Sequence, residues 1–269
     1  MLSGIGPAAH LRAHGIEATC DLPVGDNLHD HLFVPLSYAS ATGRSAAPLA
    51  FAKAVVQERL RPQSTHLSHT LFEAVGFVST GTDAEVPDLQ IFVLPMSYPA
   101  NQDEPGMHLA NPAPSLTLMP TMIYPKSRGT VRLASADPLA APLIDPNYLA
   151  DPDDLGTLVA GMELVRETIS HPAVASSVEG EILPGAGLTD RSDLAHYVRA
   201  NASGVYHPVG TCRMGVDDRA VVDPELRVHG VAGLRVVDAS IMPSIVGGNT
   251  NAAAMMIGER ASELMLAAS

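Results

Sequence analysis

The sequence contains no tryptophan, and aromatic residues make up only 4% of its 269 residues. Its two cysteines, Cys20 and Cys212, lie far apart, so they provide neither a disulfide framework nor the paired spacing of a zinc site. Basic residues number 16 against 29 acidic ones, and the net charge of −13 argues against nucleic acid and anionic membranes as partners. No apolar run is long enough to span a membrane. We therefore expect a cytoplasmic protein with no membrane span, nucleic-acid partner or bound metal.

Hydrophobic residues make up 46% of the chain, enough for one or two domains with buried cores. Strand patterns cluster in the middle and helical patterns lie beside them, which predicts an α+β or mixed α/β fold. Helices are expected at residues 7–15, 50–60, 153–170, 190–201 and 251–266. Strands are expected at residues 74–79, 89–96, 116–124, 130–133 and 234–237, with 116–124 and 130–133 forming a hairpin. Residues 16–36 and 99–114 are expected to be loops, and the polar stretch 37–48 a crossover between domains.

The helix at residues 153–170 has the clearest signals. Asp151 is placed to cap it, Pro152 suits its first position, and Asp153 and Asp154 face the positive end of the helix dipole. Its apolar residues recur at helical spacing and predict one buried face: Leu155, Leu158, Met162, Val165 and Ile169. For the helix at 190–201, Thr189 is the expected cap.

The most informative segment is Tyr206-His207-Pro208-Val209-Gly210-Thr211-Cys212-Arg213-Met214-Gly215. It is followed by Val237-Asp238-Ala239-Ser240-Ile241-Met242-Pro243 and then by Gly247-Gly248-Asn249-Thr250-Asn251. A histidine and an asparagine are each held in a turn rich in proline or glycine. Such a pair suits a proton acceptor and a hydrogen-bond donor that grip one substrate oxygen.

These segments resemble the C-terminal part of the glucose–methanol–choline (GMC) oxidoreductases, flavoenzymes that oxidise alcohols. Ser3-Gly4-Ile5-Gly6-Pro7 resembles the second signature of that family. Val24-Gly25-Asp26-Asn27-Leu28-His29-Asp30-His31 resembles its flavin-covering segment, with His29 where glutamine is usual. Ser127–Leu133 and Ile144–Leu149 resemble the start of its C-terminal region. The resemblance covers nearly the whole chain in family order.

The resemblance implies a domain organisation. Residues 1–36 and 203–269 would belong to an FAD-binding domain that is only partly present. Residues 37–202 would form a substrate-binding domain with an antiparallel sheet. Family members are about twice as long and begin with a strand, a glycine-rich turn and a helix that bind the ADP half of FAD. We therefore expect the C-terminal half of such an enzyme, with a missing N-terminal half as a possible partner.

The resemblance also assigns roles to residues. His207 would be the base that removes the hydroxyl proton of a small alcohol, and Asn249 would hydrogen-bond the same oxygen. Asn27, Asp238, Ala239, Asn249 and Thr250 would contact FAD, the expected cofactor. The first turn of the helix at 251–266 would face the negative edge of the reduced flavin. Without the resemblance, Asn249 would be read as an ordinary turn or helix-capping residue.

Several other patterns suggest different chemistry. Gly4-Ile5-Gly6-Pro7-Ala8-Ala9 fits a dinucleotide-binding glycine pattern but lacks the strand that must precede it. The pairs His29 with His31 and His10 with His14 have metal-like spacing without a third ligand nearby. Ser240 or Ser244 could pair with His207 in a hydrolase, but no nucleophile elbow is present. Cys212 beside Arg213 could be a reactive thiol, although packing beneath the His207 turn is the preferred interpretation.

Two functions of different classes therefore remain open. The first is an FAD-dependent oxidoreductase acting on CH–OH groups. The second is a non-catalytic remnant or partner-binding fragment that cannot hold FAD alone. The sequence does not identify the alcohol, although a chain so poor in aromatic rings offers few of them for a quaternary-ammonium cage.

Overall fold

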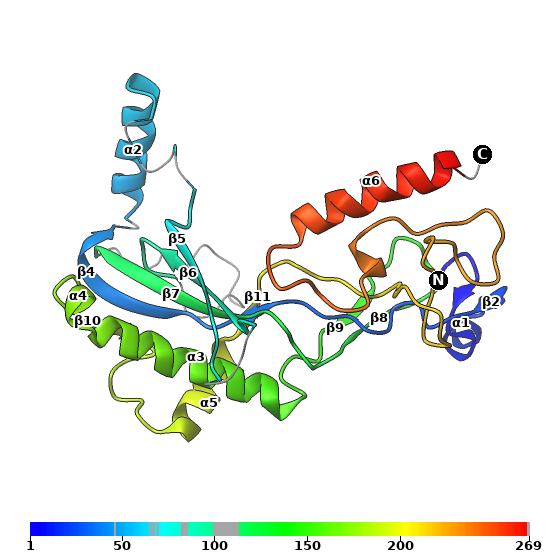
Figure 1. Cartoon of the computed structure of the whole chain (residues 1–269), viewed down its shortest axis with the longest axis horizontal. Coiled ribbons are helices and arrows are strands. Elements are labelled where there is room, and N and C mark those ends of the chain that lie inside the picture. Colours follow the sequence, from blue (N-terminus) through cyan, green and yellow to red (C-terminus); the bar gives the residue numbers. More distant parts are fainter. Residues whose placement is uncertain are drawn as a thin grey trace. The chain divides into compact units, whose positions relative to one another are not determined.

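The computed structural model describes residues 1–45, 47–63, 65, 68, 70–81, 86–98 and 113–267, and Figure 1 shows its elements. Most of the loop expected at 99–114 lies outside the described residues. The chain divides into two compact units. Unit 1 comprises Met1–His31, Ile123–Asp151 and Gly204–Ser269, and unit 2 comprises Leu32–Met122 and Pro152–Ser203. Residues 123–151 therefore group with the two chain ends, whereas the sequence analysis placed them in the middle segment.

Unit 2 is built on an antiparallel sheet with β7 (Ser115–Met122) at its centre. β6 (Leu89–Leu94) pairs along one side of β7 and carries β5 (Ala74–Val78) on its outer edge. β3 (Leu32–Phe33) and β4 (Leu36–Arg44) follow one another along the other side, and β10 (Gly180–Leu183) pairs with β4. β11 (Ser203–Gly204) lies next to β3, where the chain passes to unit 1. The antiparallel sheet expected in the middle of the chain is confirmed.

Two predictions around this sheet were wrong. Residues 37–44 form most of β4 and Pro48 begins α2, where a crossover between domains was expected. Polar residues can be buried in β4 where they find hydrogen-bond partners in the sheet. The hydroxyl groups of Ser37 and Thr117 share a buried hydrogen bond of 2.7 Å. The hairpin of 116–124 with 130–133 is also absent. β8 (Thr130–Arg132) pairs instead with β9 (Leu143–Asp145), and Gly129 bridges to the distant Leu28.

Helix α3 (Pro152–Ser170) packs on β7 and against α5 (Arg191–Asn201), as Figure 1 shows. Its predicted apolar face is confirmed, because Leu158, Met162 and Val165 are fully buried. Gly161 allows the close approach, since a β-carbon there would lie 2.9 Å from Leu89. The N-cap of α5 is Asp190 rather than Thr189. A short helix, α4 (Pro172–Ala175), follows α3.

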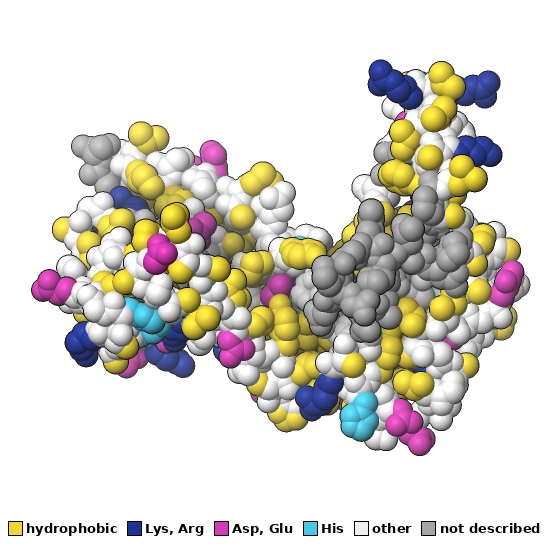
Figure 2. All heavy atoms as spheres, turned by 180° about the vertical axis from the view of Figure 1, so that it is seen from behind, with side chains coloured by type: hydrophobic (Ala, Val, Ile, Leu, Met, Phe, Trp, Pro, Cys, Tyr) yellow, Lys and Arg dark blue, Asp and Glu magenta, His cyan; other side chains and the backbone are white. Residues whose placement is uncertain are grey.

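Helix α2 (Pro48–Leu60) differs from the other helices of unit 2. Figure 1 shows it extending away from the sheet, and its apolar side chains at Leu49, Val56 and Leu60 are more than half exposed. Figure 2 shows yellow apolar side chains and dark blue lysine or arginine side chains together on this projecting helix. The helix predicted at 50–60 is confirmed, but it buries little apolar surface within the described part of unit 2.

Unit 1 has short regular elements linked by long hydrogen-bonded turns. β1 (Ile5–Gly6) pairs with β2 (Cys20–Asp21), α1 (Ala8–Ala13) lies between them, and the 3₁₀ helix η2 (Ala239–Ile241) precedes α6 (Asn251–Ala267). η2, α6 and the loops between residues 209 and 245 share one buried apolar cluster, against which Ile5 of β1 also packs: Val209, Val221, Val222, Leu226, Val228, Ile241, Met242, Ile245, Ile257 and Ala261. The cluster holds the segments that carry the His207 and Asn249 motifs in one unit.

The strand predicted at 234–237 was wrong. Only an isolated bridge between Arg227 and Arg235 forms there. Gly230 and Gly233 both adopt positive φ, so the chain turns just before this segment. Val236 and Val237 pack on the apolar cluster from a loop. Short apolar runs can therefore be buried without forming a strand.

Candidate active site

Backbone hydrogen bonds of His207 and of its neighbours hold the His207 turn in place. Its N–H donates a 2.8 Å hydrogen bond to Oδ1 of Asp30. On either side of it, the N–H of Val205 donates to the carbonyl of His31 at 3.1 Å, and Val209 and His29 exchange N–H to carbonyl bonds of 2.9 and 3.2 Å. The turn that carries His207 is thus attached to residues 29–31 at three successive points, so His207 lies on a fixed backbone.

Asp30 is the acceptor at the centre of this arrangement. The hydroxyl of Tyr148 donates to its second oxygen at 3.3 Å. Burial raises the pKa of Asp30, and the hydrogen bonds from His207 and Tyr148 oppose that rise. Gly204 is required beside the pair, because a β-carbon there would lie 2.5 Å from the Asp30 carboxylate and 2.6 Å from the Tyr148 hydroxyl.

The side chain of His207 contacts the fully buried ring of His31. The two Nδ1 atoms are 3.0 Å apart, and the rings meet edge to face with centroids 5.2 Å apart. The other ring nitrogen of His31, Nε2, lies 3.0 Å from the carbonyl oxygen of Val246. Since Val246 lies three positions before Asn249, His31 connects the His207 turn to the segment that carries Asn249.

Burial lowers the pKa of His207, and the charge of Asp30 partly opposes the shift. Burial and the neighbouring His207 lower the pKa of His31 to about 4. Hydrogen bonds to the carbonyls of Val246 and Ile123 raise this pKa and so partly oppose the shift. Both rings are therefore neutral at neutral pH. A neutral imidazole on a rigid turn is the form that a general base requires.

Hydrogen bonds of His29 and Asn27 connect the segment 24–31 to the loops near residues 210 and 245. His29 Nδ1 lies 2.6 Å from the carbonyl of Asn27, and its Nε2 accepts the N–H of Ile245 at 2.9 Å. Burial lowers the pKa of His29 to about 4. Because both nitrogens of His29 are engaged with the protein, the metal-like spacing of His29 and His31 has a structural explanation.

Asn27 has φ of +64° and a side chain engaged on both ends. Its amide Nδ2 donates to the carbonyls of Gly210 and Pro243 at 3.2 and 3.4 Å. Its Oδ1 accepts from Nε of Arg128 at 3.0 Å. The side chain of Asn27 thus holds three loops together, and its backbone carbonyl is engaged by His29.

The remaining predicted cofactor residues lie near the start of α6 or just before η2. Asn249 is exposed, and Thr250 is buried and accepts the N–H of Ala254 in the first turn of α6 at 2.9 Å. The first turn of α6 contains no acidic residue. Asp238 is exposed and caps η2 by accepting the N–H of Ser240 at 2.8 Å, and Ala239 packs on the apolar cluster.

Cys212 is placed beneath the site rather than in it. It packs against the apolar cluster, and its N–H donates to the carbonyl of Ser240 at 2.8 Å. Burial raises the pKa of its thiol, while a hydrogen bond with Ser240 opposes the rise. The packing interpretation of Cys212 is confirmed, and the reactive-thiol alternative is not supported.

The structure thus brings His207 together with Asp30, His31 and Tyr148, three residues to which the sequence analysis gave no role. Asp30 and His31 stood inside the quoted Val24–His31 motif, so a signal for them was present. Nothing in the sequence pointed to Tyr148 as a partner of Asp30, because the two residues are 118 positions apart.

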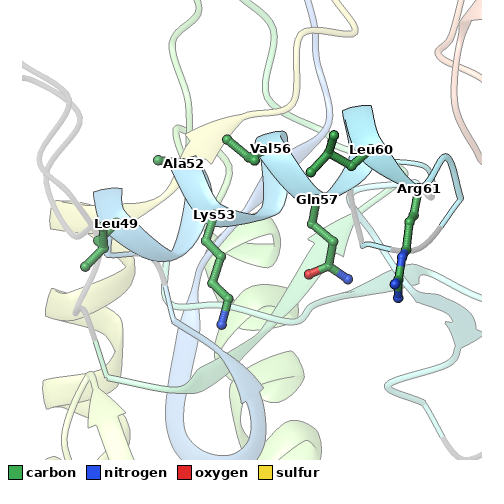
Figure 3. A pocket seen from close by; sticks show the side chains of 7 residues that line it. All are labelled: Leu49, Ala52, Lys53, Val56, Gln57, Leu60 and Arg61. Atoms are coloured by element: carbon green, nitrogen blue, oxygen red, sulfur yellow. The ribbon is translucent and has the colours of Figure 1, made fainter.

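One hollow of the described surface lies apart from the predicted site residues. A hollow in unit 2 is lined by α2 and the residue after it, and none of the predicted site residues borders it (Figure 3): Leu49, Ala52, Lys53, Val56, Gln57, Leu60 and Arg61. Among the described residues, no three His, Cys, Asp or Glu side chains are grouped to hold a metal ion. Within that same part of the chain, none of the helices is both long and apolar enough to cross a membrane.

The chain is similar in sequence to proteins of one family. Residues 125–258 match the family model described as GMC oxidoreductase. The chain is 41% identical over 274 residues to an alcohol dehydrogenase (acceptor) of Pseudomonas putida, with 99% of this chain and 48% of the relative covered. The chain belongs to the GMC oxidoreductase family. The matched span contains His207 and Asn249.

Other relatives and solved structures extend the comparison. A choline oxidase of Arthrobacter globiformis is 39% identical over 273 residues, with 100% of this chain and 46% of the relative covered. The structure of pyridoxine 4-oxidase from Mesorbium loti matches with a TM-score of 0.79 at 29% identity, covering 97% of this chain and 47% of the other. A formate oxidase of Aspergillus oryzae, in a structure concerned with FAD modification, matches with a TM-score of 0.85 at 25% identity, covering 99% and 51%. The chain spans about half the length of the relatives it matches.

Proposed function

We propose that this chain forms the catalytic C-terminal half of an FAD-dependent oxidoreductase that oxidises the CH–OH group of a small alcohol. The observation that carries the proposal is His207. It is a neutral imidazole on a turn attached to residues 29–31, and it touches a second neutral histidine. The names of the relatives, which include alcohol dehydrogenase and choline oxidase, support an alcohol as the substrate class.

The residues near α6 fit a flavin by the chemistry of their donors. The first turn of a helix of 17 residues offers unpaired N–H groups and the positive end of its dipole, and no acidic side chain neutralises it there. Asn249 and Thr250, at the start of α6, and Asp238 and Ala239, at η2, would hold the cofactor together with Asn27. Bound FAD would supply the acceptor for the hydride that leaves the alcohol carbon.

The chain's own contribution is to hold the substrate oxygen and take its proton. His207 would accept the hydroxyl proton, because its pKa is lowered and the ring is unprotonated at neutral pH. Asn249 would donate a hydrogen bond to the same oxygen and stabilise the negative charge that develops as the proton leaves. We assign unit 1 to the cofactor and catalytic residues and unit 2 to the substrate, in keeping with the antiparallel sheet of unit 2.

The competing function is a non-catalytic remnant or partner-binding fragment. The hydrogen-bonded partners of His207 favour the catalytic proposal, since a remnant has no need of a neutral histidine held against a buried one. A second half of the enzyme remains a proposed partner. The cytoplasmic location also stays a prediction, and it rests on the two free cysteines of the described chain.

His207→Ala tests the proposal in the flavin-loaded enzyme that contains this chain. Turnover should fall by at least about two orders of magnitude, the usual scale for loss of a general base, while flavin content is kept. His196→Ala is the matched control, because His196 is an exposed histidine on α5. Near-normal turnover in His207→Ala, with bound flavin, would show that His207 is not the base.

A further inference from the structure

We infer that His31 is a positioning residue, which fixes the tautomer of His207 so that Nε2 of His207 carries the lone pair that takes the substrate proton. This inference rests on the proposed function only for what the lone pair does. The tautomer itself follows from the hydrogen bonds of the two rings.

The argument begins at Val246. A carbonyl oxygen can only accept, so the 3.0 Å contact from His31 Nε2 to the carbonyl of Val246 requires a proton on that nitrogen. His31 is neutral, since it is fully buried and its pKa lies at about 4. A neutral imidazole has one ring proton, and the proton on Nε2 leaves Nδ1 of His31 as an acceptor.

The second step concerns the 3.0 Å contact between the two Nδ1 atoms. Because His31 Nδ1 is an acceptor, the proton between the rings must belong to His207. His207 is neutral too, so its only ring proton lies on Nδ1 and its Nε2 holds a lone pair. The reverse assignment would place the lone pair of His31 Nε2 against the Val246 oxygen at 3.0 Å, with nothing between them.

The backbone keeps this chain of bonds in register. His31 and His207 are joined through Asp30, which accepts the His207 N–H, and through the Val205 N–H bond to the His31 carbonyl. These bonds hold the backbones that carry the two rings side by side. The lone pair of His207 is therefore presented on the side of the ring away from His31.

Free histidine side chains prefer the proton on Nε2. Without His31, the His207 ring would lose the acceptor for its Nδ1 proton, and the lone pair would move to Nδ1, facing position 31. The base would then have its lone pair on the wrong side. A wrong tautomer in a Ser-His-Asp triad costs about 10⁴-fold in rate, so a loss of at least about tenfold is expected here.

Nitrogen-15 NMR of the histidine rings in this chain tests the inference without any catalytic assay. His207 should show a protonated Nδ1 and an unprotonated Nε2 at neutral pH. In His31→Leu, which removes the acceptor, the His207 proton should move predominantly to Nε2. His31→Gln retains an amide oxygen to accept and an amide N–H to donate, so it should restore the wild-type tautomer. His29→Gln is the control, because His29 is buried in the same segment and bonds Asn27 and Ile245 instead.

Turnover of the same variants in the flavin-loaded enzyme separates this inference from the proposed function. We expect a loss of at least about tenfold in His31→Leu, with substantial recovery in His31→Gln. The inference is overturned if His207 of the wild-type chain carries its proton on Nε2, and this measurement does not depend on any variant folding. It is also overturned if the His207 tautomer is unchanged in His31→Leu. A tautomer that moves while turnover stays normal supports the positioning role and overturns His207 as the base.

Discussion

His29 accepts the backbone N–H of Ile245 through Nε2 at 2.9 Å, and this buried bond connects two segments 216 positions apart. The same ring donates to the carbonyl of Asn27 through Nδ1 at 2.6 Å. These two bonds fix the His29 tautomer with its proton on Nδ1. His29 thus ties the segment 24–31 to the loop that leads to Asn249, which makes it a structural residue rather than a ligand.

Replacing His29 by alanine should destabilise unit 1. The N–H of Ile245 would lose its partner in a buried position, which costs on the order of 1–3 kcal/mol. His29→Gln keeps a side-chain acceptor and should lose less. Denaturant unfolding of the two variants measures the difference. Equal loss in both variants would mean that the hydrogen bond to Ile245 contributes little.

Unit 1 should also lose stability in mild acid. His29 and His31 have folded-state pKa values of about 4, below the ordinary value for histidine, because burial disfavours their charged forms. The unfolded chain therefore binds more protons than the folded chain between about pH 6.5 and pH 4. Stability contributed by each neutral ring, at most about 3 kcal/mol, is present above that window and is lost as the pH falls through it. Denaturant midpoints across this pH range provide the measurement, and His29→Gln should flatten part of the slope.

The pH dependence of the reaction should report on Asp30. The Asp30 charge raises the pKa of His207 against the lowering caused by burial, so Asp30→Asn should move the acidic limb of kcat/KM to lower pH. Asparagine can still accept the His207 N–H through its amide oxygen. Tyr148→Phe is the control, because it leaves the Asp30 charge and the His31 contact in place. A limb that shifts equally in both variants would show that the charge of Asp30 is not the cause.

Asn249 should behave differently from His207 in the flavin-loaded enzyme. It donates a hydrogen bond but takes no proton, so Asn249→Ala should slow flavin reduction by about 10²- to 10³-fold and keep the pH dependence set by His207. Asn249→His should retain partial activity, since a ring N–H can also donate to the substrate oxygen. Stopped-flow reduction rates test both variants. An unchanged rate in Asn249→Ala would remove this residue from the site.

The parts of the fold that could be predicted are those with local signals. The helix at 153–170 has its cap, its first-turn proline and its apolar face in one stretch of sequence, and the helix at 251–266 has a continuous apolar and alanine-rich pattern. The strands that failed depend on distant partners. β4 is polar because Ser37 pairs with Thr117, and β8 pairs with β9 rather than with the nearer β7. No local pattern contains that information.

The candidate site was likewise predictable only where the signal is local in sequence. His207 and Asn249 could be named because they stand in recognisable motifs. The contacts that define the chemistry of His207 come from His31 and Asp30, which lie 176 and 177 positions from it in sequence and reach it only in the folded chain. Tyr148 acts on His207 only through its hydrogen bond to Asp30. The tautomer of a histidine is set by such contacts, so sequence alone could not supply it.

Hydrogen exchange should distinguish α6 from α3 in the isolated chain. The buried face of α3 includes Leu158, Met162 and Val165, whereas α6 has only Ile257 and Ala261 buried. Its side chains at Met255, Met256 and Leu266 are more than half exposed. A helix that buries few apolar groups opens more readily by local unfolding, so amides of α6 should exchange faster than those of the middle of α3. Mass spectrometry after exchange, with peptides covering residues 155–166 and 252–266, gives the comparison. Equal protection of the two helices would show that α6 gains stability from contacts beyond its two buried residues.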